Sequence, residues 1–274
     1  MHLGQLPNKS HLPSTAPLAR TSSAPSAKPS ESQARAPVGD TLAASVSAVR
    51  KPLPVAVAKA KQAVLQIAKA NTTNEDSISD VRAQLEPHVK VLSDYFRENR
   101  PANEVELTRG TWKNLWYDDP DIDRGPGFLK LDRKRIWQVV GEKFYTNVSE
   151  AKFDLFGLQF GKIQSFLKGN YTINNEAPPA TPERPSRKNV IELEFDTNKA
   201  WFGGLPKDKS LSETVSKVES GSKWTIPVPG PKGIQGELWN LYVDKDIRIS
   251  AGIQKGESKS SGLDLYVLER GERS

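Results

Sequence analysis

The chain lacks several residue types that common catalytic and metal-binding sites require. It has no cysteine among its 274 residues, which excludes a disulfide framework, a thiolate zinc site and a cysteine nucleophile. It has three histidines, and two of them, His2 and His11, lie in a segment rich in proline, serine and alanine. Only His88 remains for the part expected to fold, so a catalytic triad or a histidine-rich metal site would depend on one imidazole. These shortages argue against most hydrolytic and redox chemistry.

The net charge of +6 is concentrated near the N-terminus. Residues 1–70 carry nine basic and two acidic side chains, whereas residues 71–274 carry 30 basic and 31 acidic ones. The part expected to fold is therefore close to neutral and has no electrostatic footprint for nucleic acid. We expect no nucleic-acid partner.

Residues 1–54 have the composition of a segment that does not fold by itself. They are rich in proline, serine and alanine and have no sustained apolar pattern. Their scarcity of acidic residues is also typical of an organelle transit peptide, so a disordered tail and a transit-like segment are both open interpretations. The chain has no run of about 18 apolar residues, so we expect no membrane-spanning helix.

Two helices are predicted between residues 55 and 100. Residues 55–70 form an alanine-rich amphipathic pattern interrupted by lysines. A second helix is expected to begin with Ser77 as N-cap, and Pro87 predicts a kink or break near Glu86. Its apolar stripe consists of Ile78, Val81, Leu85, Val89, Leu92 and Phe96. The stripe favours packing against the main domain, with binding to a membrane surface as the alternative.

From Gly110 onward, short aromatic and β-branched segments alternate with glycine, proline, asparagine and aspartate. Many short strands without intervening helices favour one antiparallel sandwich or barrel. The predicted strands cover residues 111–117, 128–131, 135–140, 144–148, 153–160, 163–173, 190–196, 200–202, 223–226, 236–243, 247–251 and 263–269. All six tryptophans lie in this region. Core packing is their default role, and a closed barrel with spare interior volume would make some of them pocket walls.

Two acidic clusters allow both a chemical and a structural interpretation. Asp244 and Asp246 are predicted to share one face of a strand, where they could do acid–base work or be neutralised by Arg248. We favour neutralisation. The segment from Asp119 to Gly125 begins like a calcium loop, but its later positions do not fit that pattern, so we favour an acidic turn and expect no metal site.

Two stretches resemble the plastid lipid-associated protein (PAP)/fibrillin family. The run Gly110-Thr-Trp112-Lys-Asn-Leu-Trp-Tyr117 is similar to the family's opening strand. The family's C-terminal signature resembles Gly236-Glu-Leu-Trp239-Asn-Leu-Tyr242-Val-Asp244-Lys-Asp246-Ile-Arg248-Ile249, followed by residues 263–268. The resemblance covers about residues 60–270.

The resemblance implies a mainly β fold. Residues 101–274 would form an antiparallel lipocalin-like β-barrel, and residues 55–100 a short N-terminal helical segment packed on it. It also implies a non-enzymatic protein without a cofactor that binds or stores small hydrophobic molecules, such as carotenoid, prenylquinone or another lipid. The expected location is peripheral, at chloroplast or cyanobacterial thylakoids or at plastoglobules, with a photoprotective role.

The resemblance also suggests which residues serve this function. The candidate ligand-binding residues are Trp112, Trp116, Tyr117, Trp137, Trp239 and Tyr242. Asp244, Asp246 and Arg248 occupy the charged positions of the motif, near the barrel mouth or in a closing network. By analogy with lipocalins, Trp112 packs at the closed end beneath an arginine, for which Arg248 and Arg270 are the candidates.

Two rival hypotheses stay open. The first is a peripheral membrane scaffold with a filled barrel that binds the membrane or a protein partner through residues 55–70 and the preceding tail. The second is an enzyme that uses Asp244 and Asp246. A dry interior well under about 300 Å³ would favour the scaffold over a carrier.

Overall fold

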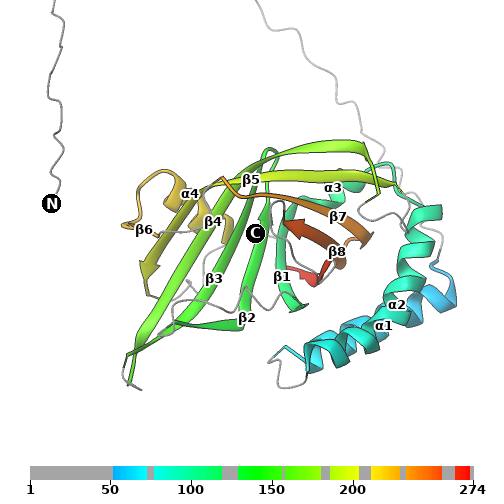
Figure 1. Ribbon diagram of the computed structural model, residues 1–274, viewed down its shortest axis with the longest axis horizontal. Helices are drawn as coiled ribbons and strands as arrows, with labels where there is room; N and C mark the ends of the chain where they lie inside the picture. Colours follow the sequence, from blue (N-terminus) through cyan, green and yellow to red (C-terminus); the bar gives the residue numbers. More distant parts are fainter. Residues whose placement is uncertain are drawn as a thin grey trace, which may run out of the picture. The chain divides into compact units, whose positions relative to one another are not determined.

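Eight antiparallel strands close into a β-barrel in the computed structural model (Figure 1). The structure describes residues 52–72, 77–118, 129–155, 158–179, 186–203, 211–228, 233–254 and 263–271. The interpretations of residues 1–51 and of the acidic segment 119–125 lie outside these residues. The predicted mainly β fold and the barrel are confirmed.

The strands follow one another around the barrel in sequence order, except that β6 is not part of the closed ring. Around the barrel the order is β1-β2-β3-β4-β5-β7-β8-β9, and β9 pairs with β1 to close it. The short strand β6 pairs only with the end of β5. The strands are β1 (Gly110–Tyr117), β2 (Leu129–Val140), β3 (Phe144–Leu155), β4 (Leu158–Ala177), β5 (Arg187–Phe202), β6 (Ile226–Pro227), β7 (Gln235–Val243), β8 (Ile247–Gln254) and β9 (Asp264–Arg270).

Several predicted strands are parts of longer ones. Segments 128–131 and 135–140 fall in β2, while segments 190–196 and 200–202 fall in β5. The prediction of one strand over residues 153–160 is wrong, because this stretch contains the end of β3 and the start of β4. Leu155 pairs with Leu158 across the reversal, so apolar residues on both sides of a tight hairpin had the appearance of a single strand.

Helices α1 (Val55–Ala70) and α2 (Ile78–Glu98) begin where the sequence predicts. Ser77 is the N-cap residue of α2, but its hydroxyl contacts that of Ser79 (2.6 Å) and does not cap the helix. The helix continues through Pro87, so of the predicted kink or break the break is wrong and the kink stays a prediction. The buried side chains of Leu85 and Val89 flank Pro87, and we attribute the continuity to the packing of this face, which offsets the missing hydrogen bond.

The hairpin of α1 and α2 covers one side of the barrel (Figure 1). The two helices pack on each other, α2 packs on β7, and α1 packs on β1 and β9. The apolar stripe of α2 belongs to the same buried cluster as the barrel residues, which confirms its predicted role in packing. None of the described helices combines the length and hydropathy needed to cross a bilayer.

Two further helices were not predicted from the sequence. The five-residue helix α3 (Glu104–Thr108) lies just before β1. Helix α4 (Leu211–Glu219) packs Val215 and Val218 against Trp201, Phe166 and residues of β2 and β3. Both helices are too short to show a strong period in the sequence, and their positions depend on the sheet that they cover.

Substitution of Leu92 tests the contribution of the helical hairpin. Leu92 is 0% exposed, whereas its neighbour Val91 on the outer face of α2 is 39% exposed. We expect Leu92→Ala to lower the free energy of unfolding by about 2–5 kcal/mol, because it leaves a cavity between α2 and the barrel. Val91→Ala should change it by only about 0.5 kcal/mol. Urea unfolding measures both, and equal effects would contradict the packing described here.

Candidate ligand-binding site in the barrel lumen

Contacts between strands that are not neighbours identify the lumen. Arg248 on β8 donates a hydrogen bond from Nη1 to Gln138 Oε1 on β2 (3.3 Å), although β1 and β9 lie between the two strands. Side chains separated by two intervening strands can meet in this way only inside a closed barrel. Alternation and strand register then place further residues on the same inner face. They include Trp112, Asn114, Val140, Tyr145, Ser250 and Leu268.

An arginine and a tryptophan close one end of the barrel. The Arg270 guanidinium lies 3.7 Å from the ring centroid of the fully buried Trp112, so Arg270 and not Arg248 is the arginine that covers this ring. Arg270 also donates to two carbonyls at the C-terminal end of α3, at 2.6 Å each. Gly110 has φ 114°, and a Cβ there would lie 2.8 Å from Arg270 Nη1. The glycine that opens the motif is therefore required by this arrangement.

Helix α3 plugs the same end through a buried polar network. Asn240 on β7 donates to Glu104 Oε1 (2.9 Å) and to Thr108 Oγ1 (2.8 Å). The other carboxylate oxygen of Glu104 accepts from Arg100 (2.5 Å) and Asn189 (2.6 Å). Glu104 is almost fully buried, and these partners offset the desolvation penalty of its charge. The plug is thereby tied to the inner face of the barrel.

Arg248 lies in the lumen beside this network. Its Nε donates to Asn240 Oδ1 (2.9 Å), and its side chain is fully buried. The prediction that it neutralises Asp244 and Asp246 is wrong. Those aspartates belong to the turn between β7 and β8, while Arg248 follows in β8 and points inward. Burial lowers the pKa of the Arg248 guanidinium to about 10, which leaves it charged at neutral pH.

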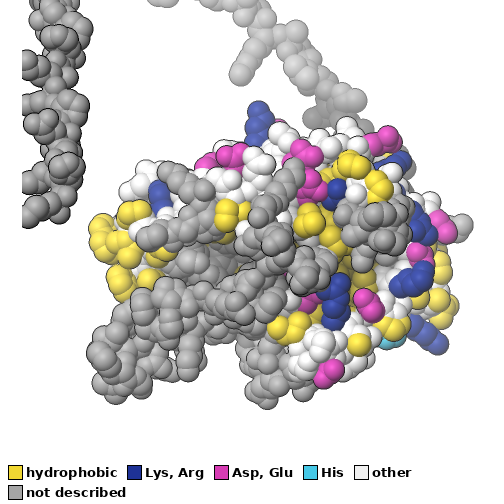
Figure 2. All heavy atoms as spheres, viewed as in Figure 1, with side chains coloured by type: hydrophobic (Ala, Val, Ile, Leu, Met, Phe, Trp, Pro, Cys, Tyr) yellow, Lys and Arg dark blue, Asp and Glu magenta, His cyan; other side chains and the backbone are white. Residues whose placement is uncertain are grey.

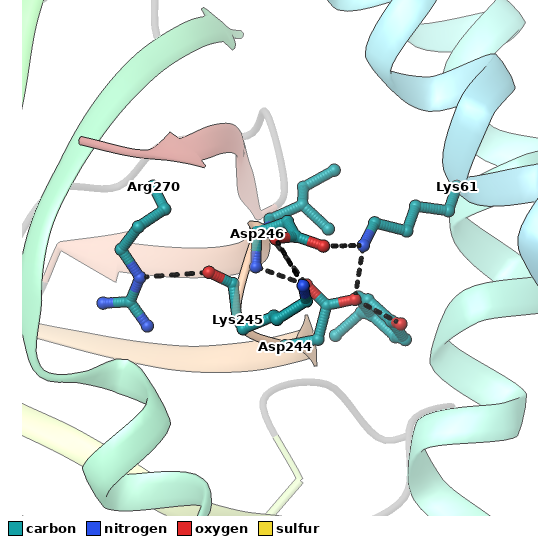
Figure 3. A network of polar contacts seen from close by, with 7 residues as sticks. Lys61, Asp244, Lys245, Asp246 and Arg270 are labelled. Atoms are coloured by element: carbon teal, nitrogen blue, oxygen red, sulfur yellow. Dashed lines mark hydrogen bonds and ion pairs between the residues drawn. The ribbon is translucent and has the colours of Figure 1, made fainter. Parts of the chain in front are cut away.

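Lys61 of α1 neutralises the two aspartates instead (Figure 3). Its Nζ lies 2.7 Å from Asp244 Oδ2 and 2.9 Å from Asp246 Oδ2. Asp244 Oδ1 accepts from the backbone N–H of Asp246 (2.8 Å) and of Ile247 (3.0 Å). The carbonyl of Lys245, in the same turn, accepts from Arg270 Nε at 3.4 Å. The motif's turn therefore joins α1 outside the barrel to the arginine that closes it.

The ion pairs at this turn shift the pKa of Asp244 and the pKa of Lys61 in opposite directions. Burial would raise the pKa of Asp244, but hydrogen bonds from Lys61 and from two backbone N–H groups lower it overall. Burial would lower the pKa of Lys61, but hydrogen bonds to Asp244 and Asp246 raise it overall. Both shifts favour the charged forms, so the turn is a structural ion-pair cluster. The lowered pKa of Asp244 is the opposite of the raised pKa that a catalytic acid needs.

Side chains fill the closed end of the lumen. A pocket there has a volume of about 10 Å³, roughly the room that one water molecule needs. It is bounded by α3, β2, β4, β5 and β7. Its lining residues are Val105, Thr108, Val140, Tyr171, Ile173, Asn189, Ile191 and Asn240. This end has no space for a lipid-sized ligand.

The opposite end is more open. The lumen-facing residues Ser149, Ser165 and Leu167 of β3 and β4 are only half-buried, whereas Val148 and Phe166 on the outer face are almost fully buried. Helix α4 covers Val148 and Phe166, whereas the inner-face side chains of this part of the sheet are partly accessible to solvent. Strands β2 to β5 contain 12, 12, 20 and 16 residues, and β1, β7, β8 and β9 contain only 8, 9, 8 and 7. The wall formed by β2 to β5 therefore extends beyond the shorter strands β1, β7, β8 and β9.

The six aromatic residues predicted to bind ligand lie on different faces of the barrel. Trp112 and Tyr117 face the lumen. Strand alternation places Trp137 on the outer face. Trp239 is also on the outer face, with Arg187 at 4.5 Å from its ring centroid. Trp116 and Tyr242 face the helices, where Tyr242 packs on Phe96 of α2. Contact of any of these residues with a ligand stays a prediction.

Four polar residues of the closed end were not singled out from the sequence. They are Lys61, Glu104, Gln138 and Asn240. Two of them carried a usable signal, because Gln138 and Asn240 each interrupt a short run of apolar residues. Lys61 had none, since Asp244 is 183 residues away in the sequence, and the contact of Glu104 with Asn240 spans 136 residues.

Comparison with known protein families agrees with this geometry. The model of the PAP_fibrillin family matches residues 58–257. The chain belongs to the PAP/fibrillin family. The match extends from α1 to just beyond β8 and includes Lys61, Asp244 and Arg248. No curated protein matches the chain significantly. PAP/fibrillin proteins are a plastid-associated family of structural, lipid-associated proteins.

Replacing Lys61 tests the ion-pair cluster at the turn. We expect Lys61→Met to lower the free energy of unfolding at pH 7 by about 1–2 kcal/mol, since it leaves the partly buried carboxylate of Asp244 next to the exposed one of Asp246 without a countercharge. Lys59→Met, on the exposed face of the same helix, should have little effect.

The pH dependence of this loss follows from the two pKa shifts. The lowered pKa of Asp244 makes its contribution complete above its ordinary value of 3.8, and the contribution disappears as the pH falls through the lower folded value. The raised pKa of Lys61 makes its contribution complete below 10.5 and lost as the pH rises through the higher folded value. Urea unfolding of wild type and Lys61→Met at several pH values measures the difference. A difference that stays constant into strong acid would contradict the cluster.

Proposed function

We propose that this PAP/fibrillin protein binds or stores a small hydrophobic molecule, such as a carotenoid, a prenylquinone or another lipid, in the open half of its barrel. The observation that carries the proposal is the accessible inner face of β3 and β4, opposite a closed and plugged end. A blind barrel of this kind takes up a ligand from one side only. Burial of apolar ligand surface contributes about 25 cal/mol per Å², so few polar contacts are needed for binding.

We further propose that the protein acts at thylakoid membranes or plastoglobules, in a photoprotective role. The rim of the open end supports a membrane contact. Phe202 at the end of β5 is 59% exposed, and Trp224, just before β6, is 70% exposed. Figure 2 shows hydrophobic side chains gathered where Figure 1 labels β6. Exposed aromatic residues of this type are favoured at the interface between lipid and water.

One observation supports the scaffold hypothesis, and another argues against it. The filled closed end agrees with a barrel packed by its own side chains. However, two lysines of the basic helix α1 are engaged by the barrel. Lys61 pairs with the aspartates of the turn, and Lys69 Nζ lies 2.8 Å from Glu269 Oε2. Helix α1 therefore contributes less free positive charge to a membrane surface than its sequence suggests.

Tryptophan fluorescence tests the carrier proposal. Plastoquinone, β-carotene or a thylakoid lipid extract should change the emission saturably. Leu167→Arg places a charge on the half-buried inner face of β4 and should weaken binding at least tenfold. The matched variant Thr172→Arg, on the exposed outer face of the same strand, should bind as wild type does. Absence of any saturable change with all three preparations would overturn the carrier proposal and favour the scaffold.

Liposome flotation tests the membrane contact. The double variant Phe202→Ser and Trp224→Ser should reduce binding to vesicles of thylakoid lipid several-fold, because it removes both exposed aromatic side chains from the rim. The control is Val55→Ser, which alters another exposed apolar residue, at the start of α1. Loss of binding in the control and not in the double variant would place the contact at α1.

A further inference from the structure

Arg248 is the one buried charge in the described part of the chain without an ion-pair partner there. Its Nε and Nη1 donate to amide oxygens of Asn240 and Gln138, and its Nη2 has no hydrogen-bond partner among the described residues. The carboxylate of Glu104 belongs to the same polar network, but Asn240 lies between it and Arg248. Each of the other buried charged side chains has an opposite charge within ion-pair distance. These are Glu104, Asp118, Glu150 and Arg187.

Two further polar atoms of the lumen also lack partners among the described residues. They are Asn114 Oδ1 and Ser250 Oγ. Strand pairing places Asn114 and Arg248 on either side of Leu268, and Ser250 lies two residues beyond Arg248 on the same face of β8. All three therefore point into one region of the lumen, above the plugged end. Buried polar groups usually have partners, so a cluster of unpaired ones indicates that a partner is supplied from outside the chain.

We propose that Arg248 holds the carboxylate of an amphiphilic ligand whose apolar tail extends toward the open end of the barrel. This inference rests on the carrier function proposed above and narrows its ligand to an acid. A carboxylate supplies the missing countercharge and accepts a hydrogen bond from Nη2, while its second oxygen suits the hydroxyl of Ser250. One arginine balances one negative charge, which favours a monovalent carboxylate over a divalent phosphate headgroup.

The lumen around Arg248 is more polar than the open half of the lumen. Around Arg248 the lumen carries the amides of Gln138, Asn240 and Asn114, whereas the open half contains apolar side chains such as Leu167 and Phe195. Arg248 Nη2 is shielded from solvent, so a headgroup reaches it by displacing side chains above it. Leu167 and Phe195 are only half-buried among the lumen-facing side chains.

Retinoic acid and retinol are suitable probes because they share an isoprenoid tail and differ at the head. Both quench tryptophan emission by energy transfer, so one titration at pH 8 measures both. We expect wild type to bind retinoic acid at least tenfold more tightly than retinol. Arg248→Gln keeps a hydrogen-bonding side chain without the charge, and it should remove this preference by weakening the binding of retinoic acid at least tenfold. Arg187→Gln, which removes a buried arginine outside the lumen, should keep the preference.

A second variant makes the test independent of the folding of Arg248→Gln. Asn114→Asp places a carboxylate on the lumen wall near Arg248 and should abolish the preference for the acid by competing with it. If wild type binds both retinoids equally, or if folded Arg248→Gln keeps the preference, the inference is wrong and the carrier function stands. If wild type binds neither retinoid and none of the lipids used above, the carrier function fails and this inference fails with it.

Discussion

Asp244 is held by its own turn on one side and by Lys61 of α1 on the other, and much of the structure depends on this arrangement. The turn it shapes presents the Lys245 carbonyl to Arg270, which covers Trp112 and holds the end of α3. A single β-turn thus positions the outer helices, the closing arginine and the plug. The acidic motif therefore has a structural role in this architecture.

The two ends of the barrel differ for a physical reason. At the closed end, buried polar groups of α3 and the strands satisfy one another, and the pocket that remains among them has a volume of only about 10 Å³. At the other end, α4 covers the outer face of the long strands and leaves their inner face half-exposed. Arg248 lies at the boundary, where polar packing ends and the accessible lumen begins. One end of the lumen is thus closed by polar packing, and the charged side chain of Arg248 lies next to it.

Much of the fold could be predicted, because it depends on local patterns. Helix α1 follows from an alanine-rich amphipathic repeat, and the strands follow from alternation between turn residues. The errors arose where tertiary contacts outweigh local preference. Pro87 does not break α2, because both its neighbours on the stripe are buried. Short helices such as α3 and α4 have no stable periodicity of their own and form on the sheet.

The sequence by itself determined the class of the fold, the family and the absence of cysteine chemistry, since these depend on composition and short motifs. Only the tertiary structure decided how the charges pair. Lys61 and not Arg248 meets the aspartates, and Arg270 and not Arg248 covers Trp112. The sequence could not show this, because strand register and the inner or outer side of a barrel depend on closure between distant segments.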